Sequence, residues 1–371
     1  MFLDCDYMED VFKYAHEKED EIIWMSQNTN ELETSPIIQM KIIEAVKKRK
    51  YALYPYQQGL AGLKELILKD LGIIDDFDAL VTNGGIEAAY VLTRAMLKKG
   101  ENVIASDPSF LPIHNQIKLC DADVKEIPIY KDPYKMTLEE INEGVDSNTK
   151  FILLIDPLNP LGSSYTREEV KGICQIAEDN NLWIIDDITY RDFAFEHTMT
   201  TEFLPEKTVI VYSFSKNCGF AGMRLGALIM PNEISKEIHR WRANPLSANI
   251  LAQVGAKAAL ETKDQWMDNM IKQSRKNQAI IKEAVDKIPD VHLPVYPSNT
   301  NMFVIDIEKT GLSPEDVQSV LLNDHKIFIR GGNYVSSRFG HKFVRVSFTV
   351  PEPQVKKFAT IFPEVIEGML E

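Results

Sequence analysis

The sequence of 371 residues contains little that would suit a membrane, secreted or metal-binding protein. No apolar run is long enough to span a bilayer, and the acidic residues 1–10 lack the basic and apolar regions of a signal peptide. The four cysteines form no CxxC pair, which favours reduced thiols over a disulfide framework or a zinc site. The seven histidines show no HExxH or similar spacing, so we expect no metal. We therefore expect a cytoplasmic protein.

Positive charge is also in the minority. The chain has 41 Lys and Arg against 55 Asp and Glu, a formal net charge of −14. Phosphate backbones would be repelled, so we expect no nucleic-acid partner, although a pocket can still be locally positive. Hydrophobic residues make up 44% and charged residues 26%, as in an ordinary globular protein. The length suits a large domain with a smaller companion.

Short β-rich runs alternate with helical stretches through the middle of the chain. Continuous apolar runs such as Phe151–Ile155 are typical of strands buried on both faces, which predicts a mostly parallel sheet covered by helices. One intervening helix is signalled by a capping box of Thr166 and Glu169. The seven predicted strands of this α/β domain are Ala79–Thr82, Asn102–Ser106, Val124–Ile129, Phe151–Ile155, Leu182–Asp186, Val209–Phe214 and Leu225–Met230.

The two ends of the chain follow other patterns. A proline at the first helical turn predicts a helix from Ser35-Pro36 to about Arg49, and a second is expected over Gly59–Leu71. Beyond a long helical region, 246–287, the sequence predicts a smaller α+β domain with strands at Asn301–Ile307, Ile327–Arg330 and Phe343–Phe348 and helices at Pro314–Leu322 and Gln354–Leu370. The resulting division is 1–45 as an N-terminal segment and part of the small domain, 46–245 as the large domain, and 246–371 as the long helix and C-terminal small domain.

A lysine stands at the end of one predicted buried strand, in Ser213-Phe-Ser-Lys216. Because burial of an unpaired ammonium is costly, such a lysine has a lowered pKa and becomes a nucleophile for carbonyls. Ser213, Ser215 and Arg224, eight residues after the lysine, could together hold a phosphate. Taken alone, the motif is more typical of a surface lysine that follows a strand.

Two further strand ends carry polar side chains. Asp187, in Asp-Asp-Ile-Thr-Tyr190, stands at the carboxyl edge of the sheet, where ligands bind in α/β folds. Asp187 could keep a pyridine nitrogen protonated, and Tyr190 could reach a phenolic oxygen. Asn159 lies in a Pro- and Gly-fixed turn, from which its amide could bond a ring substituent. Each segment could also be a plain polar loop.

A glycine turn and an aromatic residue complete the set. Gly84-Gly85-Ile86 opens a helix, where exposed N–H groups and the helix dipole favour an anion. The turn is neither GxGxxG nor a Walker loop, so no nucleotide is implied. Phe110, after the strand at Asn102–Ser106, could stack on a flat ring or be a core residue.

In this order, the motifs closely resemble the fold-type I enzymes that use pyridoxal 5'-phosphate (PLP), specifically the class I/II aminotransferases. The resemblance covers nearly the whole chain. Asn28-Thr-Asn30 is similar to that family's Asn-Glu-Asn segment, and Tyr54-Pro55 to the segment whose tyrosine reaches the cofactor phosphate of the partner subunit. Phe343-Val-Arg345-Val-Ser347 is similar to the strand whose arginine binds the substrate α-carboxylate.

The resemblance implies an aminotransferase that moves an amino group from an α-amino acid to a 2-oxo acid, 2-oxoglutarate being the expected acceptor, through a Schiff base on Lys216. It also implies a homodimer with shared active sites. Lys216, Asp187 and Tyr190 match the family's catalytic positions, and Arg345, Asn159 and Asn30 its substrate-binding positions. The matches to its cofactor-binding positions are Gly84, Gly85, Ile86, Phe110, Asn159, Asp187, Tyr190, Ser213, Ser215, Lys216, Arg224 and, from a second subunit, Tyr54.

The chain also departs from the family pattern. Ile86 stands where relatives often have a hydroxyl or acidic residue, Leu161 replaces a threonine, and Glu31 and Glu33 replace a proline and a glycine. The glutamates would suit a cationic substrate side chain or simply be solvated. Arg330, Asn333, Tyr334 and Asn249 are further candidates for the substrate pocket.

Other functions remain open at this point. The same lysine, aspartate and arginine also serve amino-acid decarboxylases, C–S lyases and cyclising synthases, and the sequence does not show which substrate bond breaks. A non-catalytic PLP-binding module, as in some transcription regulators, would carry a basic DNA-binding domain, for which the acidic leader is expected to be too short. A plain nucleotide-binding α/β protein would need a phosphate fingerprint that the sequence lacks.

Overall fold

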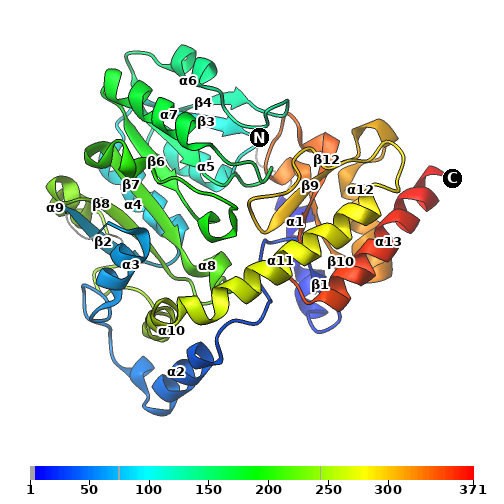
Figure 1. The fold of residues 1–371 in the computed structure, drawn as a ribbon, viewed down its shortest axis with the longest axis horizontal. Coiled ribbons are helices and arrows are strands. Elements are labelled where there is room, and N and C mark those ends of the chain that lie inside the picture. The colour runs from blue at the N-terminus through cyan, green and yellow to red at the C-terminus, as the bar shows by residue number, and fades with distance from the viewer. Residues whose placement is uncertain (1–4, 74–75, 243) are drawn as a thin grey trace.

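The computed structural model describes residues 5–73, 76–242 and 244–371. Residues 1–4, 74, 75 and 243, which belong to the predicted segments 1–45 and 46–245, lie outside this description. In Figure 1 the large sheet and its helices lie on the left, and a smaller group of strands and helices lies on the right. The long helix α11 (Lys263–Val285) passes between these two parts.

The large sheet has seven strands in the order β2-β8-β7-β6-β5-β3-β4. β8 runs antiparallel to both of its neighbours, β2 and β7, whereas the other neighbouring strands are parallel. The strands are β2 (Phe77–Thr82), β3 (Asn102–Asp107), β4 (Asp123–Pro128), β5 (Thr149–Ile155), β6 (Trp183–Asp187), β7 (Thr208–Ser213) and β8 (Gly226–Pro231). The predicted mostly parallel α/β sheet is confirmed, with every strand within two residues of its expected start.

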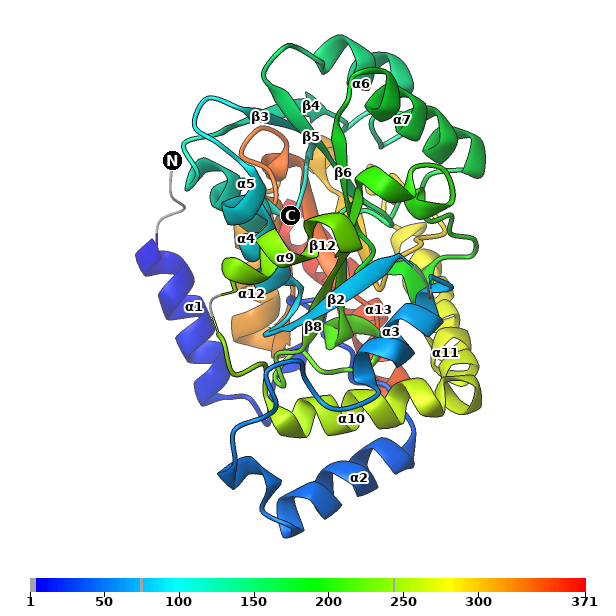
Figure 2. The same cartoon turned by 90° about the vertical axis from the view of Figure 1, so that its left-hand side faces the viewer.

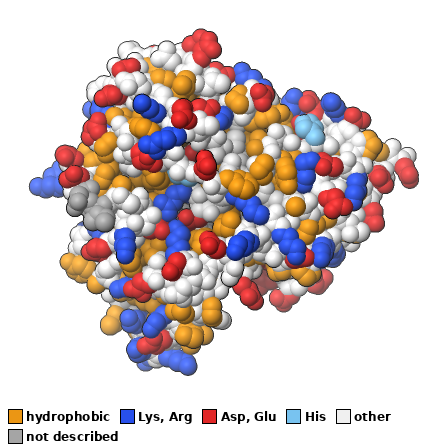
Figure 3. Space-filling model, viewed as in Figure 1, with side chains coloured by type: hydrophobic (Ala, Val, Ile, Leu, Met, Phe, Trp, Pro, Cys, Tyr) orange, Lys and Arg blue, Asp and Glu red, His pale blue; other side chains and the backbone are white. Residues whose placement is uncertain are grey.

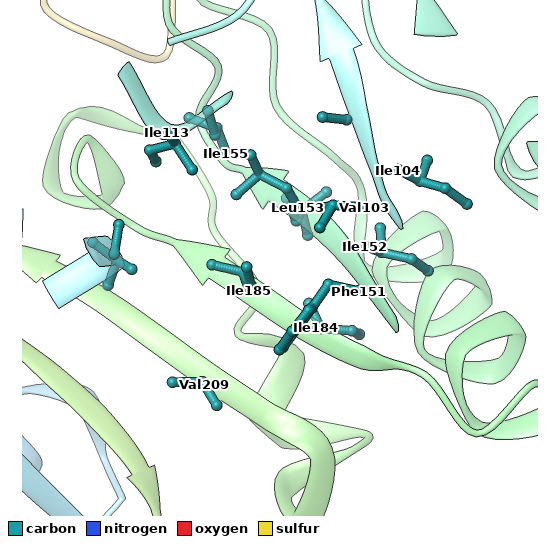
Figure 4. Close-up of a cluster of buried hydrophobic side chains, with 14 of the residues drawn as sticks. Val103, Ile104, Ile113, Phe151, Ile152, Leu153, Ile155, Ile184, Ile185 and Val209 are labelled. Atoms are coloured by element: carbon teal, nitrogen blue, oxygen red, sulfur yellow. The ribbon is translucent and has the colours of Figure 1, made fainter. Parts of the chain in front are cut away.

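The apolar runs form strands here because both faces of the sheet are covered. Along β7, Val209 and Val211 belong to one hydrophobic core, and Ile210 and Tyr212 belong to the core on the opposite face, as the two-residue period of a strand requires. Figure 4 shows the first core, in which apolar side chains of β3, β5, β6 and β7 pack around Phe151. Residues buried on both sides leave no polar face, which explains the continuous apolar sequence.

The helices of the large part follow the strands. They are α4 (Gly85–Met96), α5 (Leu111–Lys118), α6 (Leu138–Gly144), α7 (Arg167–Asp179), α8 (Phe214–Asn217) and α9 (Asn232–Arg240). The predicted capping box of α7 is present: Glu169 N donates to Thr166 Oγ1, and Thr166 N donates to Glu169 Oε2. Short 3-10 helices occupy Lys50–Ala52, Arg191–Phe193, Thr200–Glu202, Pro205–Lys207, Glu308–Thr310, Gly332–Tyr334 and Gly340–Lys342.

The smaller group has its own strands. β9 (Met302–Asp306), β11 (Arg330–Gly331) and β12 (Phe343–Ser347) form an antiparallel sheet, and β1 (Ile23–Trp24) pairs with β10 (Ile327–Phe328). The single strand predicted over Ile327–Arg330 is therefore wrong: it divides between two sheets, because its first half pairs with an N-terminal segment and its second half with β12. Helices α12 (Pro314–His325) and α13 (Glu352–Leu370) complete the group.

Four helices lie outside these two series: α1 (Cys5–Glu17), α2 (Pro36–Lys47), α3 (Leu63–Leu71) and α10 (Ile250–Glu261). The helix predicted to begin at Gly59 begins only at Leu63, because Gly59 and Gly62 have φ angles of +87° and +81°, outside the helical region. Figures 1 and 2 agree that α2 packs on α10, at the bottom of both views.

The surface carries both signs of charge. On the face drawn in Figure 3, basic and acidic side chains are interspersed, and hydrophobic side chains reach the surface over α2. No helix within the described residues is long and apolar enough to cross a bilayer.

The core around Phe151 offers a test of the fold. Leu153, 2% exposed, lies within it. We expect Leu153→Ala to lower the free energy of unfolding by about 2–5 kcal/mol, because the truncated side chain leaves a cavity between packed strands. Urea unfolding followed by circular dichroism measures the change. The matched control is Leu119→Ala, at a site 67% exposed, which should alter stability little; equal effects of the two variants would contradict this packing.

Candidate active site

A cavity of about 710 Å³ opens at the carboxyl ends of β5, β6 and β7 and extends to the strands of the smaller group. Neighbouring parallel strands end at the same edge, which brings together side chains distant in sequence. The cavity is lined by most of the residues that the sequence singled out: Gly85, Ile86, Phe110, Asn159, Asp187, Tyr190, Ser213, Ser215, Lys216, Arg224 and Arg345.

Lys216 lies in the short helix α8, directly after β7, and reaches into the cavity. Its Nζ donates to the backbone oxygen of Gln27, at 3.2 Å. Burial, reinforced by the positive charges of Arg345 and Arg224, lowers the pKa of Lys216 to about 7. At neutral pH a large fraction of this amine is therefore unprotonated and nucleophilic.

Asp187 is the last residue of β6 and is buried. Burial raises its pKa to about 6, against the opposing effect of the hydrogen bond that Thr189 N donates to Asp187 Oδ1 at 3.1 Å. No positively charged side chain among the described residues offsets the effect of burial on Asp187.

Nearby, the hydroxyl of Tyr190 accepts a hydrogen bond from Asn28 Nδ2 at 3.1 Å, and burial raises the pKa of Tyr190.

The start of α4 has the features of an anion-binding site, here called the anion cradle. No side chain caps this end of the helix, so its first N–H groups have no intrahelical partner and face outward. Ser213, Ser215 and Arg224 line the adjoining wall. Gly84 has φ of +86°, and a Cβ there would meet Arg224 Nη2 at 2.8 Å, so this position requires glycine. Gly84 lies behind the cavity lining and allows the arginine to approach.

Arg345 lines the cavity from β12. It is only 3% exposed. Its Nη1 donates to Asn159 Oδ1 at 3.0 Å and its Nη2 donates to the backbone oxygen of Ser26 at 2.7 Å. No acidic side chain pairs with it within the described residues, which leaves its positive charge available to a ligand.

Two further predicted site residues, Asn30 and Tyr54, do not line the cavity. Asn30 Nδ2 donates to the backbone oxygens of Lys216 and Asn217, at 2.9 and 3.3 Å, and so supports the segment that carries the lysine from behind. It is Asn28, two residues earlier, that lines the cavity. Tyr54 is 84% exposed, so a role at an active site would need a second chain.

The further candidates also separate. Arg330 and Tyr334 line the cavity, whereas Asn249 caps α10 and Asn333 donates to Glu315. Leu161 is buried in the core. Glu31 and Glu33 line a second cavity, of about 620 Å³, and burial raises the pKa of Glu31.

Sequence reasoning missed several residues of the site. They are Phe12, Gln27, Asn28, Thr29, Ile113, Ile155, Thr189, Ala221 and Gly222. Asn28 belongs to the segment Asn28-Thr-Asn30 that the resemblance indicates, but the predicted substrate contact is Asn30. Phe12 belongs to α1, a helix that no motif indicated.

Comparison with known proteins gives the family. The family described as aminotransferase class I and II matches residues 20–362. An aspartate aminotransferase of Pyrococcus horikoshii is 26% identical over 327 residues, covering 85% of this chain and 83% of the relative. A histidinol-phosphate aminotransferase of Methanothermobacter thermautotrophicus is 27% identical over 308 residues, covering 82% of this chain and 79% of the relative.

Solved structures agree on the fold. An aspartate aminotransferase of Thermotoga maritima superposes with a TM-score of 0.84 at 22% identity, covering 100% of this chain and 97% of that one. An aromatic aminotransferase of Pyrococcus horikoshii has a TM-score of 0.83 at 22% identity, with 95% and 97% covered. Since these two differ in the substrates that their names give, the fold alone does not identify a substrate.

The sheet and the cavity at its carboxyl edge define a fold-type I transferase. The chain belongs to the class I and II aminotransferase family, whose members depend on PLP, and it is a PLP-dependent aminotransferase that acts on amino acids and oxo acids.

The raised pKa of Asp187 gives a stability prediction for the cofactor-free protein. The folded chain binds this proton more tightly than the unfolded chain does, so ionisation destabilises the fold as the pH rises from 3.8 to about 6. Asp187→Asn avoids this loss. We expect the variant to be more stable than the wild type by about 1–3 kcal/mol near pH 8, with the difference vanishing below about pH 4. Urea unfolding at both pH values measures it.

Asp78→Asn is the matched control. Burial raises the pKa of Asp78, but hydrogen bonds from His239 and Ser235 and the charge of Lys64 outweigh it and hold this pKa below its usual range. The charged form is therefore stabilising there, and Asp78→Asn should destabilise the protein at pH 8. If both variants were destabilised alike, Asp187 would not carry an uncompensated charge.

Proposed function

We propose that the chain transfers an amino group from an α-amino acid to a 2-oxo acid, with 2-oxoglutarate as the acceptor, and that PLP is held at Lys216. The observation that supports this most is the lowered pKa of Lys216 in a cavity that also contains a buried aspartate and an anion cradle. The choice of 2-oxoglutarate follows from the family resemblance.

The donor set fits this cofactor. The N-terminus of α4 with Ser213, Ser215 and Arg224 would hold a phosphate, and Asp187 would pair with a pyridine nitrogen. The hydroxyl of Tyr190 and the amide of Asn159 would bond a ring oxygen, and Phe110 would cover a ring face. Bound there, PLP supplies an electron sink that makes the Cα–H bond of an amino acid easier to ionise.

Asp187 has one task in this arrangement. Its pKa of about 6 reflects burial without a counter-charge. A protonated ring nitrogen would be that counter-charge and would keep the carboxylate ionised. The carboxylate and the ring nitrogen would stabilise each other only when PLP is bound. This would explain why Asp187 is buried without a cation in the protein.

Lys216 and Arg345 divide the work on the substrate. Arg345 would bind the α-carboxylate through its guanidinium and so orient the amino acid. Lys216 Nζ, with a pKa of about 7, would accept the proton from Cα and later deliver it, because both protonation states are populated near neutral pH. The hydrogen bond to Gln27 O would direct Nζ meanwhile.

The domain division that the sequence suggests, 1–45, 46–245 and 246–371, is part of the proposal. Asp187 belongs to the large sheet and Lys216 to the short helix that follows β7, whereas Arg345 belongs to the small sheet. A substrate would thus bridge the two domains. One hydrophobic core, which includes Met25, Phe303 and Phe358, is formed entirely by residues of 1–45 and 246–371 and supports the division. The two cores of the large sheet also take in a few residues from 246–371, such as Val304 and Ala252.

The proposal is tested with an absorbance spectrum of the purified protein with PLP. We expect a visible cofactor band that disappears when a suitable amino acid is added and returns with 2-oxoglutarate. In Lys216→Ala, turnover should fall by at least ~10³-fold while some cofactor still binds, because the proton carrier is lost. The control is Lys207→Ala, which removes an exposed lysine just before β7.

Two outcomes would overturn the proposal. Wild-type turnover in Lys216→Ala would show that Lys216 is not the catalytic lysine. A cofactor band that responds to an amino acid but never returns with any 2-oxo acid would mean that the chemistry is not amino transfer.

A homodimer with shared active sites is the second part of the proposal. Tyr54 follows a stretch of exposed apolar side chains that continues from α2. The exposed members are Met40, Ile43, Val46, Tyr51, Leu53, Tyr54 and Tyr56. A patch of this kind is typical of an interaction surface. In the dimer that the family resemblance implies, each Tyr54 would reach the cofactor phosphate of its partner.

Tyr54 supplies the corresponding test. We expect Tyr54→Phe to weaken PLP binding by about 10-fold, because one hydrogen bond to a charged group is lost. Fluorescence titration of the cofactor-free protein measures the Kd. Tyr56→Phe, on the same exposed loop, is the control and should bind like the wild type. Since Tyr54 does not line its own cavity, a selective loss supports a contribution from the second subunit; unchanged binding would contradict it.

A further inference from the structure

One charged residue that lines the cavity has no role in the proposed function. Arg330, in β11, lines the cavity and is only 5% exposed. Among the described residues no hydrogen-bond partner for its Nε is found, and no carboxylate lies within ion-pairing distance of its guanidinium. Burial of an unpaired charge is costly, so an arginine in such a position is normally paired with something. The missing partner points to a ligand.

The neighbours of Arg330 increase this cost. Arg330 and Arg345 are directly opposite each other in the β11–β12 pair, so their side chains leave the sheet on the same face. Burial, and next the charge of Arg345, lower the pKa of Arg330 to about 10, which still leaves it charged at neutral pH. Two positive charges thus share one end of the cavity.

Two aromatic rings fix the orientation of Arg330. Its guanidinium carbon lies 3.8 Å from the ring centroid of Tyr334 and 4.7 Å from that of Phe12. Stacking of this kind covers the faces of the guanidinium and leaves its N–H edge for a planar anion. Phe12 comes from α1, which packs on α12 through Ala15 and Leu322 and lies beside it in Figures 1 and 2.

We propose that Arg330 binds a second anionic group of the substrate, so that the preferred amino acids and 2-oxo acids carry a carboxylate or phosphate on the side chain. This inference rests on the proposed function, in which Arg345 takes the α-carboxylate. The cofactor phosphate is a different anion, because its cradle at Arg224 and α4 is formed by the large sheet. An acidic side chain would neutralise the second guanidinium, whereas a neutral one would leave it buried and unpaired.

The experiment compares amino donors on the PLP-loaded enzyme. The panel is L-aspartate, L-glutamate and O-phospho-L-serine against L-asparagine, L-glutamine and L-alanine, with kcat/KM taken from single-turnover absorbance changes. We expect the wild type to prefer an acidic donor over its neutral counterpart by at least about 10-fold. Preference for the phosphorylated donor would identify the distal anion as a phosphate, and preference for aspartate or glutamate would identify it as a carboxylate.

Arg330→Gln tests the residue. We expect the ratio of kcat/KM for the acidic donor to that for its neutral counterpart to fall by about 10- to 100-fold, because a charge-assisted bond is lost. Arg330→Lys should lie between, since it keeps the charge but loses the planar fork. Arg338→Gln is the matched control: it removes an arginine whose side chain is 52% exposed, on the same connection to β12, and should leave the ratio unchanged.

A binding measurement separates this inference from the proposed function. Calorimetry with succinate and with butyrate needs no turnover, and Arg330→Gln should lose the wild-type preference for succinate. If no amino donor reacts but succinate still binds through Arg330, the proposed function fails and the anion site stands. If donors react but acidic and neutral ones do so equally, or if Arg330→Gln keeps the wild-type ratio, Arg330 binds no second anion.

Discussion

Positive charge gathered in one cavity, where Arg330 and Arg345 are buried, dominates this structure. Lys216, Arg224, Arg330 and Arg345 line one cavity in a chain of net charge −14. Each would be stabilised by a carboxylate, yet none of the four forms an ion pair with an acidic side chain among the described residues. The stability that these charges cost has to come from the packed cores on both faces of the large sheet and between the small sheet and its helices. The fold can therefore tolerate a cavity whose charges are balanced only by ligands.

Negative charge is distributed by the same rule. Asp187 is buried at the end of β6 without a cation, and its pKa is raised by burial, whereas Asp78 accepts hydrogen bonds from His239 and Ser235 and keeps a low pKa. The two carboxylates differ in surroundings and not in residue type. Asp78 has its partners in the protein, whereas under the proposed function Asp187 would gain its partner only when the cofactor binds.

The sequence predicts those parts of the fold and the site that depend on local patterns, and it does not predict those that depend on contacts between distant segments. The apolar runs predict the sheet, and strand ends then bring Asn159, Asp187 and Lys216 to one edge, because parallel strands end together. Phe12 and Asn28 depend on how N-terminal segments return to the cavity, which no local pattern encodes. The choice between Asn28 and Asn30 turns on the direction of two side chains, and Asn28 has a φ of +53° that local sequence does not indicate.

Under the proposed function, the two sheets divide recognition of the substrate from the chemistry. Lys216 and Asp187 are fixed by strands of the large sheet, and Arg330 and Arg345 by the pairing of β11 with β12. Because that pairing sets the spacing of the two guanidinium groups, the small sheet defines which anions fit, without altering the groups that move the proton. Two proteins with the same large-sheet residues could therefore act on different amino acids. A change at β11 would alter substrate preference first, since the lysine and aspartate stay where the large sheet holds them.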